Sequence, residues 1–127
     1  MDDPIYDTGM KVRREVLGDE HVDRALAAGT PFTRPFQDFI TRYAWAGVWT
    51  RSGLDRRFRS AITLALLAAL GREEELAVHV RAAQRNGLSD AEIAEVFIHT
   101  AIYAGVPAAN AAFARARQVL AGEGQET

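Results

Sequence analysis

The residue types best suited to proton transfer are a glutamate and a histidine four positions apart, Glu75 and His79. Residues at that spacing are neighbours on one face of a helix. A carboxylate beside an imidazole is a minimal general acid/base unit, because the carboxylate orients the ring and favours its cationic form. An ordinary exposed pair of side chains has the same spacing, so the pattern alone leaves both interpretations open.

A second pair at this spacing, His99 and Tyr103, lies among the apolar residues Val96, Ile102 and Val106. A histidine on such a face is commonly a hydrogen-bonded core residue. The alternative is that both side chains line a ligand pocket, and we carry them as candidate substrate-binding residues.

Two tryptophans and four arginines gather around a glycine turn within residues 45–60. Interleaved arginines and aromatic residues occur in nucleic-acid-binding proteins, and residues 88–120 superficially resemble a helix-turn-helix. The net charge of −2 disfavours a nucleic-acid partner, and the supposed recognition helix is alanine-rich with few base-reading groups. The rim of a pocket for an anionic small molecule fits better. Its candidate substrate-binding residues are Trp49, Arg51, Arg59 and Ser60.

Cysteine is absent, which excludes disulfides, thiolate nucleophiles and cysteine zinc sites in this chain. The three histidines form no HExxH or similar ligand pair, so we expect no metal site. A metal site assembled from separate helices is the unsupported alternative. Only Lys11 is a lysine among the fifteen basic residues. Coding bias explains that ratio, and so does a need for guanidinium groups that grip carboxylates.

Helical signals dominate the chain, and no stretch alternates with the two-residue period of a strand. Glycines and prolines separate the periodic segments, Asp55 is placed to cap a helix, and Ser89 with Glu92 forms a capping-box pattern. The predicted helices span about 6–17, 20–28, 35–46, 55–70, 72–86, 89–104 and 108–120.

A length of 127 residues suits one domain, with N-terminal helices in 1–34 and a tail at 122–127 that we expect to be frayed. No apolar run approaches the roughly 20 residues that span a bilayer, and the first residues are not a secretory signal. We therefore expect a cytoplasmic protein with no membrane partner. The apolar stretches 61–70 and 96–112 exceed what one small domain covers, which predicts self-association.

The segment from Gly47 to about Ala114 contains, in order, GVWTRSGLDRRFRS, ELAVHVRAA and HTAIYAGVPAA. Through these motifs it resembles the carboxymuconolactone decarboxylase family. The resemblance implies an all-α fold, a single-domain antiparallel helical bundle of the alkylhydroperoxidase D-like type with six to seven helices, and a homohexamer. Ser52 stands where the family pattern has proline, a departure that touches the stiffness of a turn rather than chemistry.

Redox members of the same superfamily use a CxxC motif followed by a histidine. In register with that motif the histidine falls on His79, the second cysteine on Glu75 and the first on Arg72. The upstream acid of the redox pattern falls near Ser60. This chain keeps the histidine and lacks both thiols, so peroxidase activity is excluded.

The resemblance implies decarboxylation of 4-carboxymuconolactone to the β-ketoadipate enol-lactone in protocatechuate catabolism. The substrate is a small dicarboxylate lactone whose carbonyl accepts the electron pair, so no cofactor is expected. The protein must then hold the spectator carboxylate, desolvate the leaving one and protonate the carbanion. Arg51, the walls Trp49 and Tyr103, and the pair Glu75 and His79 suit these three tasks.

Several assignments stay open. Arg59 is an alternative to Arg51, and His99 to His79. Another small carboxylated lactone is an alternative substrate. A non-catalytic oligomeric ligand-binding module is a further alternative, and such a module would tolerate neutral replacement of both Glu75 and His79.

Overall fold

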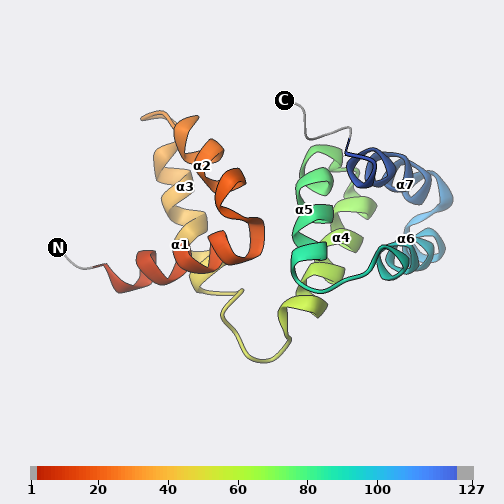
Figure 1. The fold of residues 1–127 in the computed structure, drawn as a ribbon, viewed down its shortest axis with the longest axis horizontal. Coiled ribbons are helices and arrows are strands. Elements are labelled where there is room, and N and C mark those ends of the chain that lie inside the picture. The colour runs from red at the N-terminus through yellow and green to blue at the C-terminus, as the bar shows by residue number, and fades with distance from the viewer. Residues whose placement is uncertain (1–2, 123–127) are drawn as a thin grey trace. The chain divides into compact units, whose positions relative to one another are not determined.

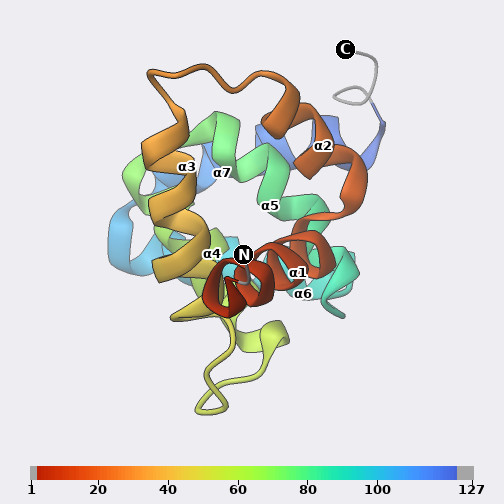
Figure 2. The same ribbon diagram turned by 90° about the vertical axis from the view of Figure 1, so that its left-hand side faces the viewer.

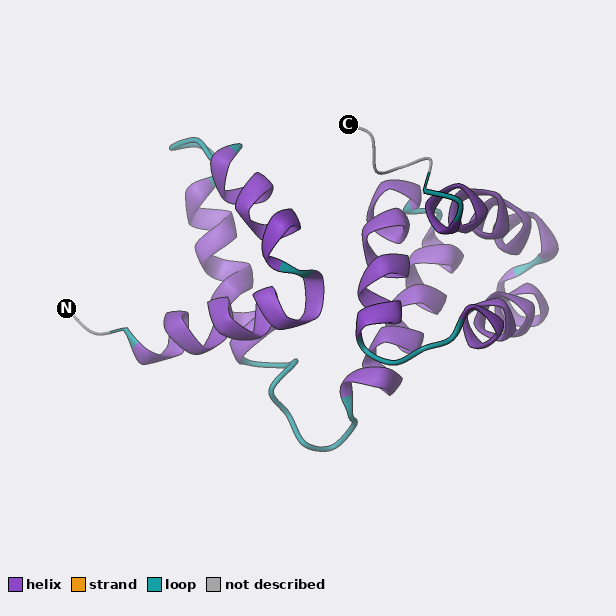
Figure 3. Ribbon diagram, in the orientation of Figure 1, coloured by secondary structure: helices purple, strands orange, loops and turns teal. Residues whose placement is uncertain are grey.

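The computed structural model describes residues 3–122, which consist of helices joined by loops and contain no strand (Figures 1 and 3). The all-α prediction is confirmed. The elements are α1 (Pro4–Leu17), α2 (Asp19–Ala27), α3 (Arg34–Ile40), the π-helical segment η1 (Thr41–Ala46), α4 (Arg56–Leu70), α5 (Glu73–Arg85), α6 (Asp90–Ala104) and α7 (Val106–Leu120).

Local signals set most of the helix ends. Gly18 and Gly105 directly follow α1 and α6. Their φ values are 92° and 104°, in a region of backbone conformation that residues other than glycine rarely adopt. The predicted capping box is confirmed. The Ser89 hydroxyl accepts from the Glu92 N–H at 3.1 Å, and the Glu92 carboxylate accepts from the Ser89 N–H at 2.9 Å.

Two predicted segments differ in detail from the structure. The last helix begins at Val106 rather than at Ala108, because Pro107 sits in the first turn, where its missing N–H costs nothing. The third predicted helix changes from α to π geometry at Thr41. Of the tail expected to be frayed, residues 123–127 lie outside the described range.

Contacts divide the chain into two compact units, residues 1–56 and 57–127, and each is described by itself. The expectation of one domain over residues 1–127 stays a prediction. No helix within residues 3–122 has the length and apolar character that crossing a membrane requires.

In the first unit, α1 lies against η1, the π-helical end of the helix that α3 begins (Figure 2). Gly9 makes this approach possible, because an added Cβ would overlap the carbonyl oxygen of Thr41. Buried Arg13 reinforces the packing of α1 on the helix formed by α3 and η1, because its Nη2 donates to Gln37 Oε1 at 2.9 Å. The buried apolar side chains of the first unit are Val12, Val16, Val22 and Trp45.

In the second unit, α4 to α7 share one hydrophobic core. It is built on small and branched residues, which allow the helices to approach closely. The buried members are Leu64, Ala68, Leu76, Val80, Ala83, Leu88, Ile93, Phe97, Ala112, Ala116 and Val119. Leu76, Val80 and Ala83 form a buried stripe at helical spacing along α5, so the core fixes the rotation of this helix.

Apolar side chains also lie outside this core. Leu66 and Leu70 on α4 are 56% and 67% exposed, and Ile102 on α6 is 77% exposed. These positions belong to the two apolar stretches noted in the sequence. Within the second unit these side chains are not covered.

Candidate active site

Helix α5 carries the predicted proton-transfer residues. Its first turn contains Glu73, Glu74 and Glu75, where carboxylates interact favourably with the positive end of the helix dipole. Since Leu76 and Val80 face the core, Glu75 and His79 fall at its edge, one helical turn apart. Glu75 is exposed and His79 is half-buried. The predicted placement of the two residues on one face is therefore confirmed.

The Glu75 carboxylate has no hydrogen-bond or ion-pair partner among residues 3–122. The structure thus places Glu75 beside His79 without a direct bond between them. An exposed carboxylate one turn from an imidazole remains able to reach either the ring or a bound ligand.

Helix α6 carries His99 and Tyr103, whose ring centroids lie 5.0 Å apart. Both side chains are exposed, and Tyr103 is 81% exposed. The interpretation of His99 as a core histidine is therefore wrong. The two rings form an exposed aromatic surface on the side of α6 that also carries Ile102.

Helix α4 places Arg59 half-buried and Ser60 fully buried. The Ser60 hydroxyl accepts a hydrogen bond from Asn86 Nδ2 at 2.9 Å. Asn86 is the C-cap of α5, so this bond ties the first half of α4 to the end of the helix that carries His79. Sequence reasoning missed Asn86, because an asparagine at a helix end gives no sign of a distant partner.

Arg57, at the start of α4, reinforces the same junction. Its Nε donates to the carbonyl oxygen of Gly87 at 3.3 Å, and its guanidinium also pairs with Glu92. Glu92 at the same time closes the capping box of α6. One arginine therefore joins α4 to the connection between α5 and α6.

Trp49 and Arg51 belong to the first unit and follow η1. Trp49 is half-buried and packs on buried Trp45, with ring centroids 5.4 Å apart. Arg51 is exposed, and its backbone N–H donates to the carbonyl oxygen of Val48 at 3.0 Å. The other six candidate residues all belong to the second unit.

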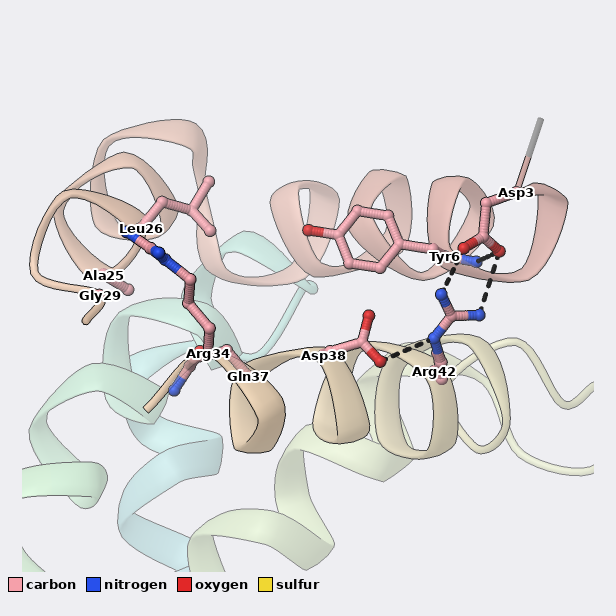
Figure 4. A pocket seen from close by; sticks show the side chains of 9 residues that line it. All are labelled: Asp3, Tyr6, Ala25, Leu26, Gly29, Arg34, Gln37, Asp38 and Arg42. Carbon is pink, nitrogen blue, oxygen red and sulfur yellow. Dashed lines mark hydrogen bonds and ion pairs between the residues drawn. The ribbon is translucent and has the colours of Figure 1, made fainter. Parts of the chain in front are cut away.

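The first unit also holds a cavity of about 440 Å³ between α1, the end of α2 and the α3–η1 helix (Figure 4). Arg42 pairs with Asp3 and, at 2.9 Å, with Asp38, while its guanidinium lies 5.6 Å from the Tyr6 ring centroid. The hydrogen bond from Arg42 lowers the pKa of Asp3. None of the predicted substrate-binding residues lines this cavity. Its charges are largely balanced internally, which indicates a structural role.

Comparison with known proteins places these features in a family. The carboxymuconolactone decarboxylase family model matches residues 34–118. A 4-carboxymuconolactone decarboxylase from Acinetobacter baylyi is 48% identical over 119 residues, which cover 94% of this chain and 89% of that protein. A nitrosuccinic acid decarboxylase from Metarhizium robertsii is 48% identical over 103 residues, covering 81% of this chain and 72% of that protein.

A second 4-carboxymuconolactone decarboxylase, from Pseudomonas putida, is 59% identical over 39 residues, covering 31% of this chain and 81% of that sequence. The family match spans α3 to nearly the end of α7 and includes all eight candidate residues. The helical alkylhydroperoxidase D-like fold expected from the motifs is the fold of this family. The chain belongs to the carboxymuconolactone decarboxylase family.

Proposed function

We propose that this protein decarboxylates 4-carboxymuconolactone to the β-ketoadipate enol-lactone and CO2. The observation that carries the proposal is the 48% identity, over 94% of the chain, to a protein of that name. Helix α5 supports the proposal, because it carries a carboxylate, Glu75, and an imidazole, His79, one turn apart at the edge of the core.

The reaction breaks the bond between the lactone ring and the departing carboxylate. The electron pair moves through the ring double bond into the lactone carbonyl and forms a dienolate. A proton added at the carbon next to that carbonyl then gives the enol-lactone. Because the substrate supplies its own electron sink, the reaction requires no pyridoxal, thiamine or metal.

In this proposal His79 delivers the proton, and Glu75 keeps its imidazole charged and oriented. Arg51 binds the spectator carboxylate, and Arg59 is the alternative residue for that role. Trp49, Tyr103 and His99 supply the walls that exclude water. Ser60 has a structural role, because its buried hydroxyl accepts a hydrogen bond from Asn86 that joins α4 to the end of α5.

Nitrosuccinate is the second candidate substrate, favoured by the relative from Metarhizium robertsii. Loss of the carboxylate beside its nitro group leaves an electron pair that the nitro group accepts as a nitronate, which a proton then quenches. Both molecules thus combine a departing carboxylate, a built-in electron sink and a spectator carboxylate. The same arginine and proton donor would serve either reaction.

The proposal includes a single-domain subunit assembled as a cytoplasmic homohexamer. The exposed apolar side chains of α4 and α6 support self-association, since a soluble monomer rarely leaves so much apolar surface uncovered. Light scattering at micromolar concentration tests this part, and a mass near 13.9 kDa, that of one chain, would contradict it.

Mixing the purified protein with 4-carboxymuconolactone tests the activity directly. We expect loss of the lactone absorbance and release of one CO2 per substrate molecule. A parallel reaction with nitrosuccinate compares kcat/KM for the two substrates. Preference for nitrosuccinate would reassign the substrate, and no CO2 from either would leave a non-catalytic ligand-binding module.

A further inference from the structure

An apolar groove lies between α6 and α7 in the second unit, apart from every candidate residue of the decarboxylation site. Its volume is about 650 Å³, within the range of small-molecule sites. The lining residues are Asp90, Ile93, Ala94, Phe97, Asn110, Phe113, Ala114, Ala116, Arg117, Leu120 and Ala121.

The groove offers aromatic surface to an occupant. Phe97 is fully buried and meets Phe113 edge to face, with ring centroids 5.4 Å apart. Phe113 is 38% exposed, so part of its ring is left open. Aromatic rings prefer offset or edge-to-face partners of their own kind, which favours a flat ring in this position.

Two polar side chains at the groove lack partners within the described part of the chain. Arg117 and Asn110 make no side-chain hydrogen bond or ion pair among residues 3–122. A guanidinium beside an apolar surface is suited to a carboxylate, which it grips with two parallel hydrogen bonds.

Asp90 limits how much negative charge the groove accepts. This carboxylate lines the same groove and accepts a hydrogen bond from Gln84 Nε2 at 2.9 Å. Its charge repels a second carboxylate on an occupant. The arrangement therefore favours one negative charge, unlike the dicarboxylate proposed as substrate.

We propose that the α6–α7 groove is a second ligand site, which binds a small aromatic monocarboxylate. The ring packs on the open part of Phe113, which buried Phe97 holds in place from below, and the carboxylate pairs with Arg117. Asn110 donates a further hydrogen bond from its side-chain amide.

Titration calorimetry of the full-length protein with benzoate tests the proposal. We expect saturable binding of one benzoate per chain. Terephthalate has a second carboxylate, and benzyl alcohol has a neutral hydroxymethyl group in place of the carboxylate of benzoate. Each should bind at least about tenfold more weakly than benzoate. Arg117→Gln and Phe113→Ala should weaken benzoate binding by a similar factor. Arg115→Gln is the matched control, because Arg115 lies on the same helix, pairs with Gln118 and does not line the groove.

Three results would overturn the proposal. One is the absence of saturable binding at about 10 mM benzoate. Another is binding that Arg117→Gln and Phe113→Ala leave unchanged. The third is a fall in the mass of the assembly on Phe113→Ala, which would identify the groove as a contact between copies of the chain. Decarboxylation should be unaffected by Arg117→Gln, so this test is independent of the proposed activity.

Discussion

Half-buried Asn86 donates a hydrogen bond of 2.9 Å to the buried hydroxyl of Ser60, which joins the C-terminal end of α5 to α4. Ser60 is 1% exposed, so water does not replace this contact when it is lost. The bond holds the helix of Arg59 against the helix of His79. It therefore links the stability of the second unit to the geometry of the candidate site.

Replacing Ser60 with alanine should destabilise the protein and spare catalysis. The loss leaves the Asn86 amide without its acceptor, which costs about 1–3 kcal/mol of unfolding free energy. Urea unfolding measures this cost, and turnover of the folded protein should stay within about threefold. Because the two residues are partners, Ser60→Ala combined with Asn86→Ala should cost less than the sum of the single changes. Normal stability with turnover reduced about a hundredfold would instead make Ser60 a substrate ligand.

Arg51→Gln should weaken binding of the substrate. A charge-assisted pair with a carboxylate contributes about 1.5–3 kcal/mol, so KM should rise by about tenfold or more. Arg51→Lys should recover part of the loss, because it keeps the charge without the planar fork. Arg24→Gln is the control, since Arg24 is exposed on α2 and pairs with Glu20. If Arg51→Gln leaves KM as unchanged as the control does, Arg59 replaces Arg51 as the residue proposed to bind the spectator carboxylate.

His21 should make stability depend on pH. Burial disfavours its charged form, with Arg24 and Arg13 adding repulsion, and lowers the pKa of His21 below the ordinary value of 6.5. The unfolded chain then binds this proton more readily than the folded one. Above pH 6.5 His21 is neutral in both states, and its stabilising effect is complete. The effect is lost as the pH falls below 6.5 and through the lower pKa of the folded protein. As the pH falls across this interval, the denaturant midpoint should fall less steeply for His21→Gln than for the parent protein. Equal dependence of the midpoint on pH in the two proteins would contradict the lowered pKa of His21.

Treatment with a chelator should leave turnover unchanged. The proposed chemistry places the electron sink in the substrate, so no Lewis acid is required. Among residues 3–122 no group of three or more histidine, aspartate or glutamate side chains is arranged to hold a metal ion. The measurement is the rate of CO2 release before and after dialysis against a strong chelator. Activity that disappears and returns with one divalent metal would refute this part of the mechanism.

The sequence predicted what depends on neighbouring residues. Ser89 and Glu92 lie three positions apart, and their capping box forms as expected. The four-residue spacing of Glu75 and His79 correctly predicts that they share one face of α5. Short-range signals suffice here because capping and periodicity act within one or two turns of a helix.

The features that the sequence did not reveal depend on contacts between distant segments. Asn86 meets a serine 26 positions away, and Arg42 meets Asp3 across 39 positions. The exposure of His99 likewise depends on which face of α6 packs against the core, and that face carries Ile93 and Phe97. Its neighbours are apolar on both faces, so periodicity does not identify the buried one. The change to π geometry at Thr41 has no local signal that we can identify.

The most direct measurement of the central claim is a double-mutant cycle on Glu75 and His79, with 4-carboxymuconolactone turnover as the readout. His79→Asn and Glu75→Gln should each reduce kcat by about 10²–10⁴-fold, the range expected for losing general acid/base assistance. The double variant should be little worse than the poorer single one, because either loss disables the shared function. Thermal stability should barely change in all three. Turnover within about threefold of the parent in both single variants would contradict the account and make Glu75 and His79 an ordinary surface pair.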